Sequence, residues 1–340
     1  MRKYLLTTGF VMAACLSAPA LALETSFHGA TMRLSGYGTA GMIQPDFDNP
    51  DFLGDWRVRA QLGYSSTAQN TLGLVYSLDA QTVAGDDYID DLFIMWQARD
   101  LGRIEFGFTE SIAGKLGLGL PDVGGLRVND NPLFYDKINP DGPIVSDGAV
   151  DSGDKALRIN LATASRGGAQ YGLSVAGITD DFDFAVDVGA KFRRPHGKTK
   201  TALALGASFI SRPDNFQADH YARKLTADWR GQVSAGINVQ YNSWVWGINA
   251  RAVYDENALG RASDGLSAGT GLSYDVLNYS LSLSYILSDT GIWHDGDRAY
   301  VDNTVVGSFR YKYSKNVDGW TSVGVSSHTP FLSAGLRITF

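Results

Sequence analysis

The side chains that could do chemistry in this 340-residue chain are scattered along it. The alternating serines of 280–284 fit a strand better than the strained turn of a nucleophilic serine. The aspartate pairs Asp86-Asp87 and Asp90-Asp91 could hold a divalent cation, although a solvated acidic loop is the simpler interpretation. The histidines have no metal-ligand spacing such as H-E-x-x-H; they are His28, His196, His220, His294 and His328. The sequence therefore predicts no catalytic residue, no metal site and no cofactor.

The charged residues form a more informative pattern. The segment 110–154 shows no strand alternation, and a stretch of that length needs a reason in a compact architecture. It is acidic overall, with Asp122, Asp130, Asp136, Asp141, Asp147, Asp151 and Asp154 against Lys115, Arg127 and Lys137. Arginines recur on the polar phase of alternating stretches, at Arg33, Arg57, Arg59, Arg158, Arg251 and Arg310. The segment and the arginines are the two charged sets that a fold would have to bring together.

Two interpretations of these charges stay open. Opposed charges across a narrow, water-filled gap create a transverse field, which small hydrophilic solutes cross more readily than apolar ones. In that case the basic side would come from Arg33, Arg57 and Arg59, on the polar phases of the first two alternating stretches. Asp130 and Asp136 are chosen for the acidic side from their central position in 110–154. Alternatively, the arginines only pair with carboxylates and hold the segment in place.

Strands must position these charges, and the strand signal is repeated along the chain. In 56–64, WRVRAQLGY, every second residue is apolar and aromatic residues stand at both ends of the apolar face, as in the interfacial girdles of a membrane barrel. The same alternation predicts sixteen strands. They are 31–43, 55–64, 70–79, 88–98, 102–109, 155–164, 169–177, 181–192, 199–210, 231–241, 243–254, 265–274, 276–287, 301–313, 319–326 and 330–340.

The connections between these strands support the count. If the first strand rises from the periplasmic side, every second connection should be a short inner turn. The long segments then all fall in the other, outward set, which holds 44–54, 110–154, 211–230, 255–264 and 288–300. An even number of strands and a consistent loop asymmetry together predict an all-β, transmembrane antiparallel barrel with a long third outward loop.

Composition agrees with a barrel better than with its alternatives. Mean hydropathy is −0.11, charged residues are 19%, and no long apolar stretch follows residue 23, so membrane-spanning helices are not expected. A closed barrel satisfies every backbone polar group in hydrocarbon. The strands of a soluble β-sandwich also alternate, but the polar phases here are rich in Gly, Ser and Asn and rarely charged, which fits the lumen of a barrel better. The formal net charge of −7 argues against nucleic-acid binding.

The first 22 residues predict export. Arg2 and Lys3 precede the apolar stretch 4–16, and Ala20-Leu21-Ala22 forms an A-x-A cleavage site, so 23–340 would be the mature domain. An uncleaved anchor would need a longer apolar stretch. A lipoprotein modified at Cys15 is the other alternative. Cys15 is the single cysteine, so a cleaved chain would form no disulfide.

The chain ends in LSAGLRITF, with apolar residues at alternate positions back from the terminus. A terminal phenylalanine in this phase resembles the assembly signal of outer-membrane barrels, here Leu336, Ile338 and Phe340. Residues 32–38, MRLSGYG, resemble the first strand of the Gram-negative general-diffusion porin family. Residues 101–108, LGRIEFGF, resemble that family's fifth strand. The overall pattern resembles the family over roughly residues 24–340.

The resemblance carries expectations beyond the strand pattern. It implies a homotrimer of sixteen-stranded barrels in the outer membrane, assembled by the barrel-assembly machinery and surrounded by lipid and lipopolysaccharide. It implies that 110–154 folds into the lumen and faces a basic wall, so that ions and small hydrophilic solutes diffuse passively. Carried over to this chain, Arg57 and Arg59 are the better candidates for that wall, and Arg33 would lie lower in the barrel. A substrate-selective channel is the alternative within transport. An outer-membrane hydrolase would need a matched Ser-His pair, and an adhesive or scaffold barrel usually carries a periplasmic domain.

Overall fold

The protein is described here from a computed structural model. The structure describes residues 23–48, 50–67, 70–81, 89–123, 157–177, 184–211, 229–256, 262–289, 301–326 and 329–340. Within these ranges the chain is almost entirely β. The strands are β1 Leu23–Phe27, β2 Ala30–Pro45, β3 Asp51–Thr67, β4 Asn70–Gln81, β5 Ile89–Ala98, β6 Gly102–Phe108, β7 Leu157–Thr163, β8 Ala169–Ala176, β9 Phe184–His196, β10 Thr199–Ser211, β11 Trp229–Tyr241, β12 Trp244–Glu256, β13 Ala262–Val276, β14 Tyr279–Asp289, β15 Val301–Lys312, β16 Val317–Ser326 and β17 Thr329–Thr339.

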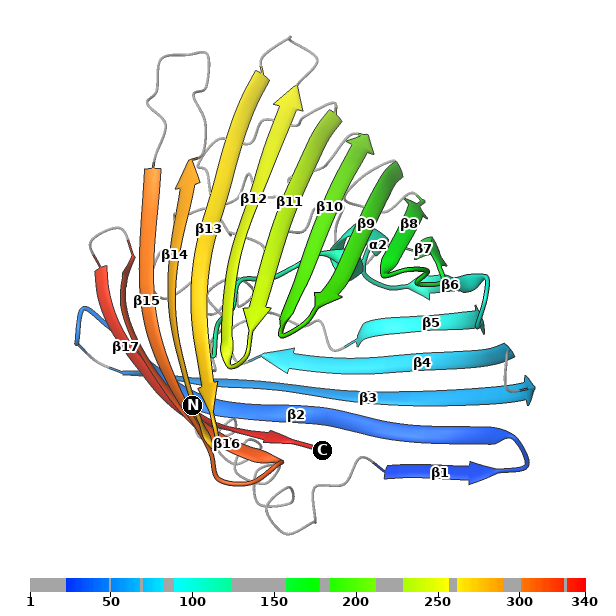
Figure 1. Ribbon diagram of the computed structural model, residues 1–340, viewed down its shortest axis with the longest axis horizontal. Helices are drawn as coiled ribbons and strands as arrows, with labels where there is room; N and C mark the ends of the chain where they lie inside the picture. Colours follow the sequence, from blue (N-terminus) through cyan, green and yellow to red (C-terminus); the bar gives the residue numbers. More distant parts are fainter. Residues whose placement is uncertain are drawn as a thin grey trace.

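Strands β2 to β17 form one closed antiparallel ring (Figure 1). Each strand pairs with the next along the chain, and β17 returns to pair with β2 over Tyr37–Pro45. The terminal Phe340 extends this seam, because its backbone exchanges hydrogen bonds of 2.8 and 2.9 Å with Gly36. The barrel therefore has no open edge along this part of β2.

The short strand β1 completes the same seam. It pairs with residues Ala30–Leu34 of β2, directly beyond the point where the C-terminus stops. A turn at His28 and Gly29, both with positive φ, joins the two strands. The two ends of the described chain thus lie along one strand, one after the other.

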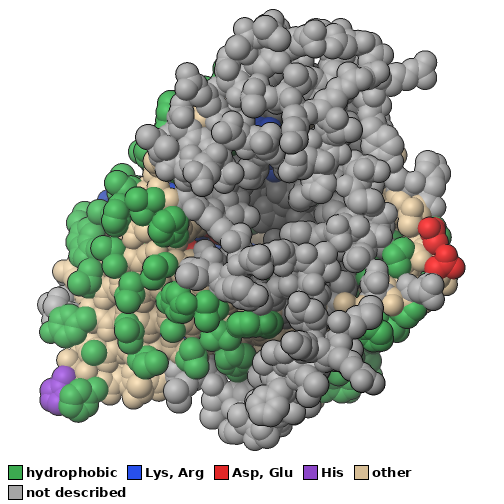
Figure 2. Space-filling model, turned by 180° about the vertical axis from the view of Figure 1, so that it is seen from behind, with side chains coloured by type: hydrophobic (Ala, Val, Ile, Leu, Met, Phe, Trp, Pro, Cys, Tyr) green, Lys and Arg blue, Asp and Glu red, His purple; other side chains and the backbone are tan. Residues whose placement is uncertain are grey.

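Side chains alternate between the two faces of the wall, apart from register irregularities at Ser65–Thr67 and Ser77–Leu78. On β14 the outward Leu281, Leu283 and Tyr285 are 52%, 57% and 41% exposed, whereas the inward Ser282 and Ser284 are buried. Figure 2 shows apolar side chains spread over the outer surface of the strands. In the part of the chain that is described, no helix is long and apolar enough to cross a membrane.

The predicted sixteen-stranded antiparallel barrel is confirmed, and each predicted strand has its counterpart. Several details were wrong. β3 covers Asp51–Thr67, so part of the predicted outward segment 44–54 is strand. β1 was not predicted; β9 continues to His196, where a turn was expected from Arg193. β13 continues to Val276, so the next turn lies at Leu277 and Asn278 instead of Asp275. The predicted leader, 1–22, lies outside the described residues.

Candidate functional site

The candidate site is the inner face of the barrel together with the segment that follows β6. This segment contains the short helix α2, Ile112–Leu116, and is described as far as Val123. Its backbone and side chains bond to lumen-facing residues of distant strands. Ile112 N donates to Ser174 Oγ on β8 at 3.4 Å, and Gly119 O accepts from Asn238 Nδ2 on β11 at 3.1 Å.

The contacts continue as far as β14. There Ser282 Oγ donates to Asp122 Oδ1 at 3.0 Å, and Val123 N donates back to Ser282 Oγ at 3.1 Å. Residues 109–123 therefore follow the inner wall from β6 to β14. The prediction that all of 110–154 folds into the lumen also concerns 124–154, which lie outside the described residues.

Glycines on the lumen phase make room for this path. A Cβ at Gly189 would lie 3.1 Å from Ala113 Cα, and a Cβ at Gly269 would lie 2.6 Å from Leu120 Cδ1. The glycines in such close contact with 109–123 are Gly172, Gly189, Gly236, Gly247, Gly269 and Gly271. Most side chains at these glycine positions would push the segment off the wall. The Gly-rich lumen phase therefore lets the segment pack closely against the wall.

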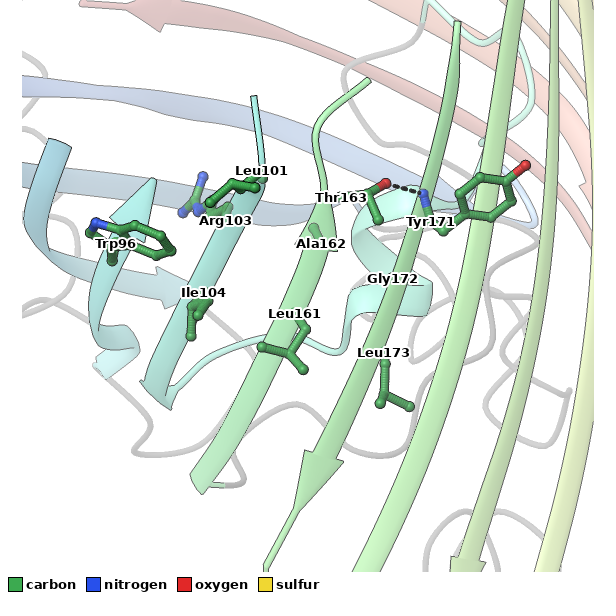
Figure 3. Close-up of a pocket in the computed structure, with 11 residues that line it drawn as sticks. Trp96, Leu101, Arg103, Ile104, Leu161, Ala162, Thr163, Tyr171, Gly172 and Leu173 are labelled. Carbon is green, nitrogen blue, oxygen red and sulfur yellow. Dashed lines mark hydrogen bonds between the residues drawn. The ribbon is translucent and has the colours of Figure 1, made fainter. Parts of the chain in front are cut away.

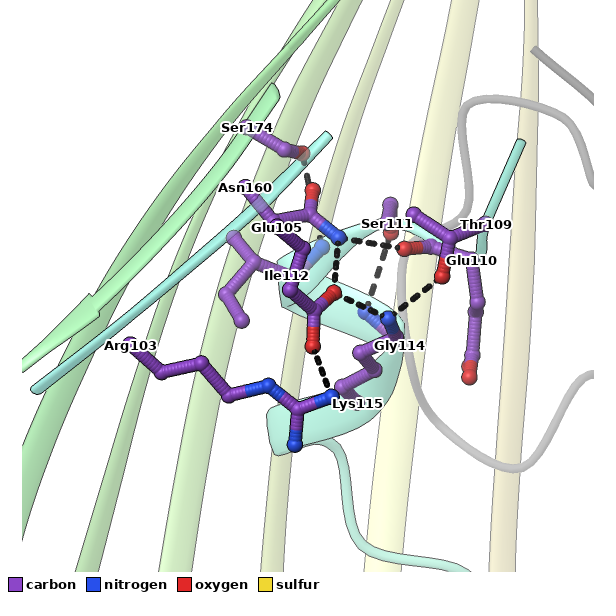
Figure 4. Close-up of polar contacts among 10 residues, drawn as sticks. All are labelled: Arg103, Glu105, Thr109, Glu110, Ser111, Ile112, Gly114, Lys115, Asn160 and Ser174. Atoms are coloured by element: carbon purple, nitrogen blue, oxygen red, sulfur yellow. Dashed lines mark hydrogen bonds and ion pairs between the residues drawn. The ribbon is translucent and has the colours of Figure 1, made fainter. Parts of the chain in front are cut away.

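A buried carboxylate anchors α2 to the wall (Figure 4). Glu105 of β6 is 3% exposed. Its Oε2 accepts from Lys115 Nζ at 2.5 Å and from Asn160 Nδ2 at 2.9 Å, and its Oε1 pairs with Arg103 at 2.6 Å. Lys115 Nζ also donates to Thr109 Oγ1 at 2.6 Å. Hydrogen bonds from two sides compensate the desolvation of the carboxylate.

A second buried pair lies directly beside α2. Arg158 NH1 stands 3.3 Å from Asp187 Oδ2, and both side chains are 0% exposed. Ser174 Oγ donates to the same carboxylate oxygen at 2.8 Å while accepting from Ile112 N. Arg158, chosen from the sequence as a pore residue, is therefore buried from lumen water and pairs with Asp187, which is linked through Ser174 to the start of the segment.

The other predicted arginines lie on the lumen phase at different levels of exposure. Arg57 and Arg59 stand opposite Tyr37 and Ser35 of β2 and are half-buried, and Arg33 is exposed. Arg251 of β12 is only 6% exposed. Asp130 and Asp136 lie outside the described residues. The structure thus gathers Arg33, Arg57 and Arg59 on β2 and β3 and leaves Arg158 and Arg251 on other parts of the wall.

Sequence reasoning missed a cation cluster around Phe93 of β5. Arg59 Cζ, Arg103 Cζ and Lys115 Nζ lie 6.0, 5.6 and 4.9 Å from the centroid of this ring. The lumen phase of β6 could have indicated Arg103, since Glu105 shares it two residues on. Lys115 has no such signal, because its place depends on the path of the segment.

A shallow pocket of about 410 Å³ lies elsewhere, where β5 and β7 end and β6 and β8 begin (Figure 3). It is lined mainly by outward-facing side chains, among them Trp96, Ile104, Leu161, Tyr171 and Leu173. The pocket therefore belongs to the apolar outer surface and not to the lumen. Within the described ranges, no three His, Cys, Asp or Glu side chains are grouped as metal ligands.

No protein-family model and no curated protein sequence matches the chain. Solved structures do match it. OmpT of Vibrio cholerae, described as a trimer form, superposes with a TM-score of 0.69 at 10% identity, covering 92% of this chain and all of that one.

Two further structures agree. An anion-selective porin from Comamonas acidovorans gives a TM-score of 0.64 at 13% identity and covers 92% of this chain and all of its own. OmpF of Salmonella typhi, in complex with daunomycin, gives 0.64 at 12% identity, covering 94% of this chain and all of its own. Likeness at these identities establishes the fold, which is that of the sixteen-stranded outer-membrane porins.

Proposed function

We propose that this chain forms a water-filled channel in the outer membrane, through which ions and small hydrophilic solutes diffuse passively, and that it is not an enzyme. One observation carries the proposal: a single closed ring of strands is apolar on its outside and polar on its inside. An apolar outer band suits hydrocarbon, and a polar interior suits water. The porin fold of its structural relatives supports the same conclusion.

The narrow part of the channel would be formed by 110–154 and the wall that faces it. Arg33, Arg57 and Arg59 would supply the basic side, since they lie on the lumen phase of β2 and β3. Asp130 and Asp136 would supply carboxylates from the segment. A field between such groups orients polar solutes and disfavours apolar ones.

Arg158 and Arg251 would act differently, because each is less than a tenth exposed. We assign them to holding the wall and the segment instead of contacting solutes. Arg158 has the clearer case, since its pair with Asp187 also positions the serine that bonds α2.

The proposal includes assembly and location. The chain would be exported by a leader at 1–22, inserted by the barrel-assembly machinery through a signal that includes Leu336, Ile338 and Phe340, and surrounded by lipid and lipopolysaccharide. It would function as a homotrimer, as the trimer form of the Vibrio cholerae relative suggests.

Swelling of proteoliposomes tests the channel directly. Vesicles that contain the folded protein should swell in isotonic arabinose, and more slowly in larger sugars, because a wet pore admits neutral solutes by size. Vesicles without protein, and vesicles with heat-unfolded protein, are the controls. If folded protein leaves the vesicles impermeable to arabinose, the channel function is refuted.

A further inference from the structure

We propose that the pocket on the outer wall, at the junction of β5 to β8, binds an anionic phospholipid such as phosphatidylglycerol. In this site an acyl chain occupies the pocket, and the lipid phosphate lies between Arg166 and Arg194. The inference rests on the proposed outer-membrane location and adds a specific partner to it. It starts from an apolar pocket that opens beside a cluster of cations.

The pocket is a gap between large apolar side chains of the outer face. Figure 3 shows Trp96 on one side and Tyr171 on the other, with Ile104 and Leu161 between them. Each of these four side chains is between 38% and 50% exposed. Gly102 also lines the pocket, with a φ of +130°, and an added Cβ there would clash with a backbone oxygen of β7. No side chain can therefore fill the pocket at this point.

The wall formed by Tyr171 is held in place from both sides. Its ring packs edge-on against Phe192 of β9, with 5.7 Å between the ring centroids. Its backbone N donates to Thr163 Oγ1 on β7 at 3.0 Å. Because this wall is ordered before a ligand arrives, little conformational freedom is lost when an acyl chain binds against it.

A guanidinium reaches the edge of the pocket from the turn between β7 and β8. Arg166 Nη2 donates to the backbone oxygen of Asp100 at 2.7 Å, and the next residue, Leu101, lines the pocket. The acceptor is a neutral carbonyl, so this bond positions the guanidinium without neutralising its charge. The strongest partners of a guanidinium are charged oxygens, such as those of a phosphate.

A second guanidinium lies beside the same turn, on β9. Arg193 N donates to Gly168 O at 2.8 Å, which holds this end of β9 against the turn. Arg194 follows on the outward phase, two residues beyond Phe192. It is therefore about 7 Å further along the strand than the ring that supports Tyr171, on the same face of the wall as the pocket.

Carboxylates do not balance the cations at this end of the barrel. The turns that join β5 to β6, β7 to β8 and β9 to β10, with the adjoining ends of β9 and β10, contain one carboxylate, Asp100. Their six cations are Arg99, Arg166, Arg193, Arg194, Lys198 and Lys200, so the net charge is +5. The next carboxylate along these strands, Glu105, lies on the lumen side and pairs with Arg103. Among the described residues, none of the six cations makes an ion pair.

The excess charge is confined to this sector. The turn at 242–243, between β11 and β12, carries no charged residue, and neither does the stretch 65–69 between β3 and β4. A cluster of Lys and Arg next to an apolar surface in the membrane binds anionic lipid headgroups. A soluble anion would use the cations and leave the pocket empty, whereas a phospholipid uses both.

The position of the pocket indicates which lipid fits. It lies at the short turns, which face the periplasm in barrels of this kind, while the long segments lie at the opposite ends of the strands. The leaflet on the periplasmic side of an outer membrane consists of phospholipid. Lipopolysaccharide occupies the other leaflet, so its phosphates lie far from Arg166 and Arg194.

Brominated lipids test the site, because bromine on an acyl chain quenches tryptophan fluorescence on contact. Folded protein in phosphatidylcholine vesicles receives rising fractions of brominated phosphatidylglycerol or of brominated phosphatidylcholine. Trp96→Phe keeps an apolar wall but removes the reporter, so the quenching that this variant lacks comes from the pocket. We expect that signal to saturate at a lower fraction of phosphatidylglycerol than of phosphatidylcholine.

The two arginines are then removed without touching the pocket itself. Arg166→Gln and Arg194→Gln should each weaken the apparent affinity for phosphatidylglycerol about fivefold, the usual effect of one basic residue near an anionic membrane surface. The double variant should bind the two lipids almost equally. Lys315→Gln, at an exposed turn between β15 and β16, is the matched control and should keep the preference.

The outcomes separate the site from the proposed function. Equal quenching of Trp96 by the two lipids, or a preference that the double variant keeps, would overturn the anionic site. Quenching of Trp96 by neither lipid would also overturn it and would indicate that a second copy of the chain covers this face. Trp244 and Trp246, on the outward phase of β12, should be quenched by both lipids in any inserted barrel. If no tryptophan is quenched, the membrane location itself is refuted.

Discussion

The outward phase of β14 allows the membrane-facing surface to be tested with one charge. Leu283 points outward and is 57% exposed, between the outward Tyr279 and Tyr285. It is four residues beyond Tyr279, which is about 14 Å along a strand and about 10 Å in height at the usual tilt. The apolar band of such barrels is about 25 Å tall, so Leu283 lies near its middle. Leu283→Arg should therefore destabilise the barrel by about 2–4 kcal/mol.

Guanidinium unfolding of the protein in phospholipid vesicles measures this cost. Leu281→Arg, only about 5 Å above the tyrosine level, should cost less, about 1–2 kcal/mol. Gln240→Arg is the matched lumen control on the inward phase of β11 and should cost close to nothing. Equal stability of all three variants and the parent would refute the assignment of the outer face to hydrocarbon.

Two other predictions concern the lumen segment and the seam. Gly189→Leu should push α2 off the wall, since even a Cβ would meet Ala113, and tryptic cleavage after Lys115 should rise. Gly63→Leu, whose Cβ would have its nearest neighbour at 3.6 Å, should leave cleavage unchanged; equal cleavage in both variants would contradict the wall contact. Deletion of Phe340 removes two seam hydrogen bonds, each contributing about 1 kcal/mol, and should lower the folded fraction in the membrane without reducing export. Normal levels of the folded variant in the membrane would count against this role of Phe340.

The strand pattern was predictable from the sequence because each strand reports its own environment. A wall with hydrocarbon on one side and water on the other forces a period of two, so β14 can be identified from its own residues. β1 could not be identified from its own residues, because it is stabilised by its pairing with β2. It covers Ala30–Leu34 of β2, directly beyond Gly36, which bonds to Phe340.

The residues of the candidate site also fall into two groups: those that the sequence could place and those that it could not. Strand phase alone places Arg57 and Arg59 on the lumen side, as predicted. Strand phase cannot show that Arg158 would be covered, or that Lys115 would reach Glu105, because both depend on the path of 109–123 across the wall. The Gly-rich lumen phase was visible in the sequence. Only the path of 109–123 shows that these glycines make room for the segment.

The most direct test of the whole account is single-channel conductance of the purified, folded protein in a planar bilayer. The account predicts large, ohmic steps that close in thirds, as three parallel open barrels would. A correctly folded protein that inserts but conducts no current would contradict it and would indicate a plugged or purely structural barrel.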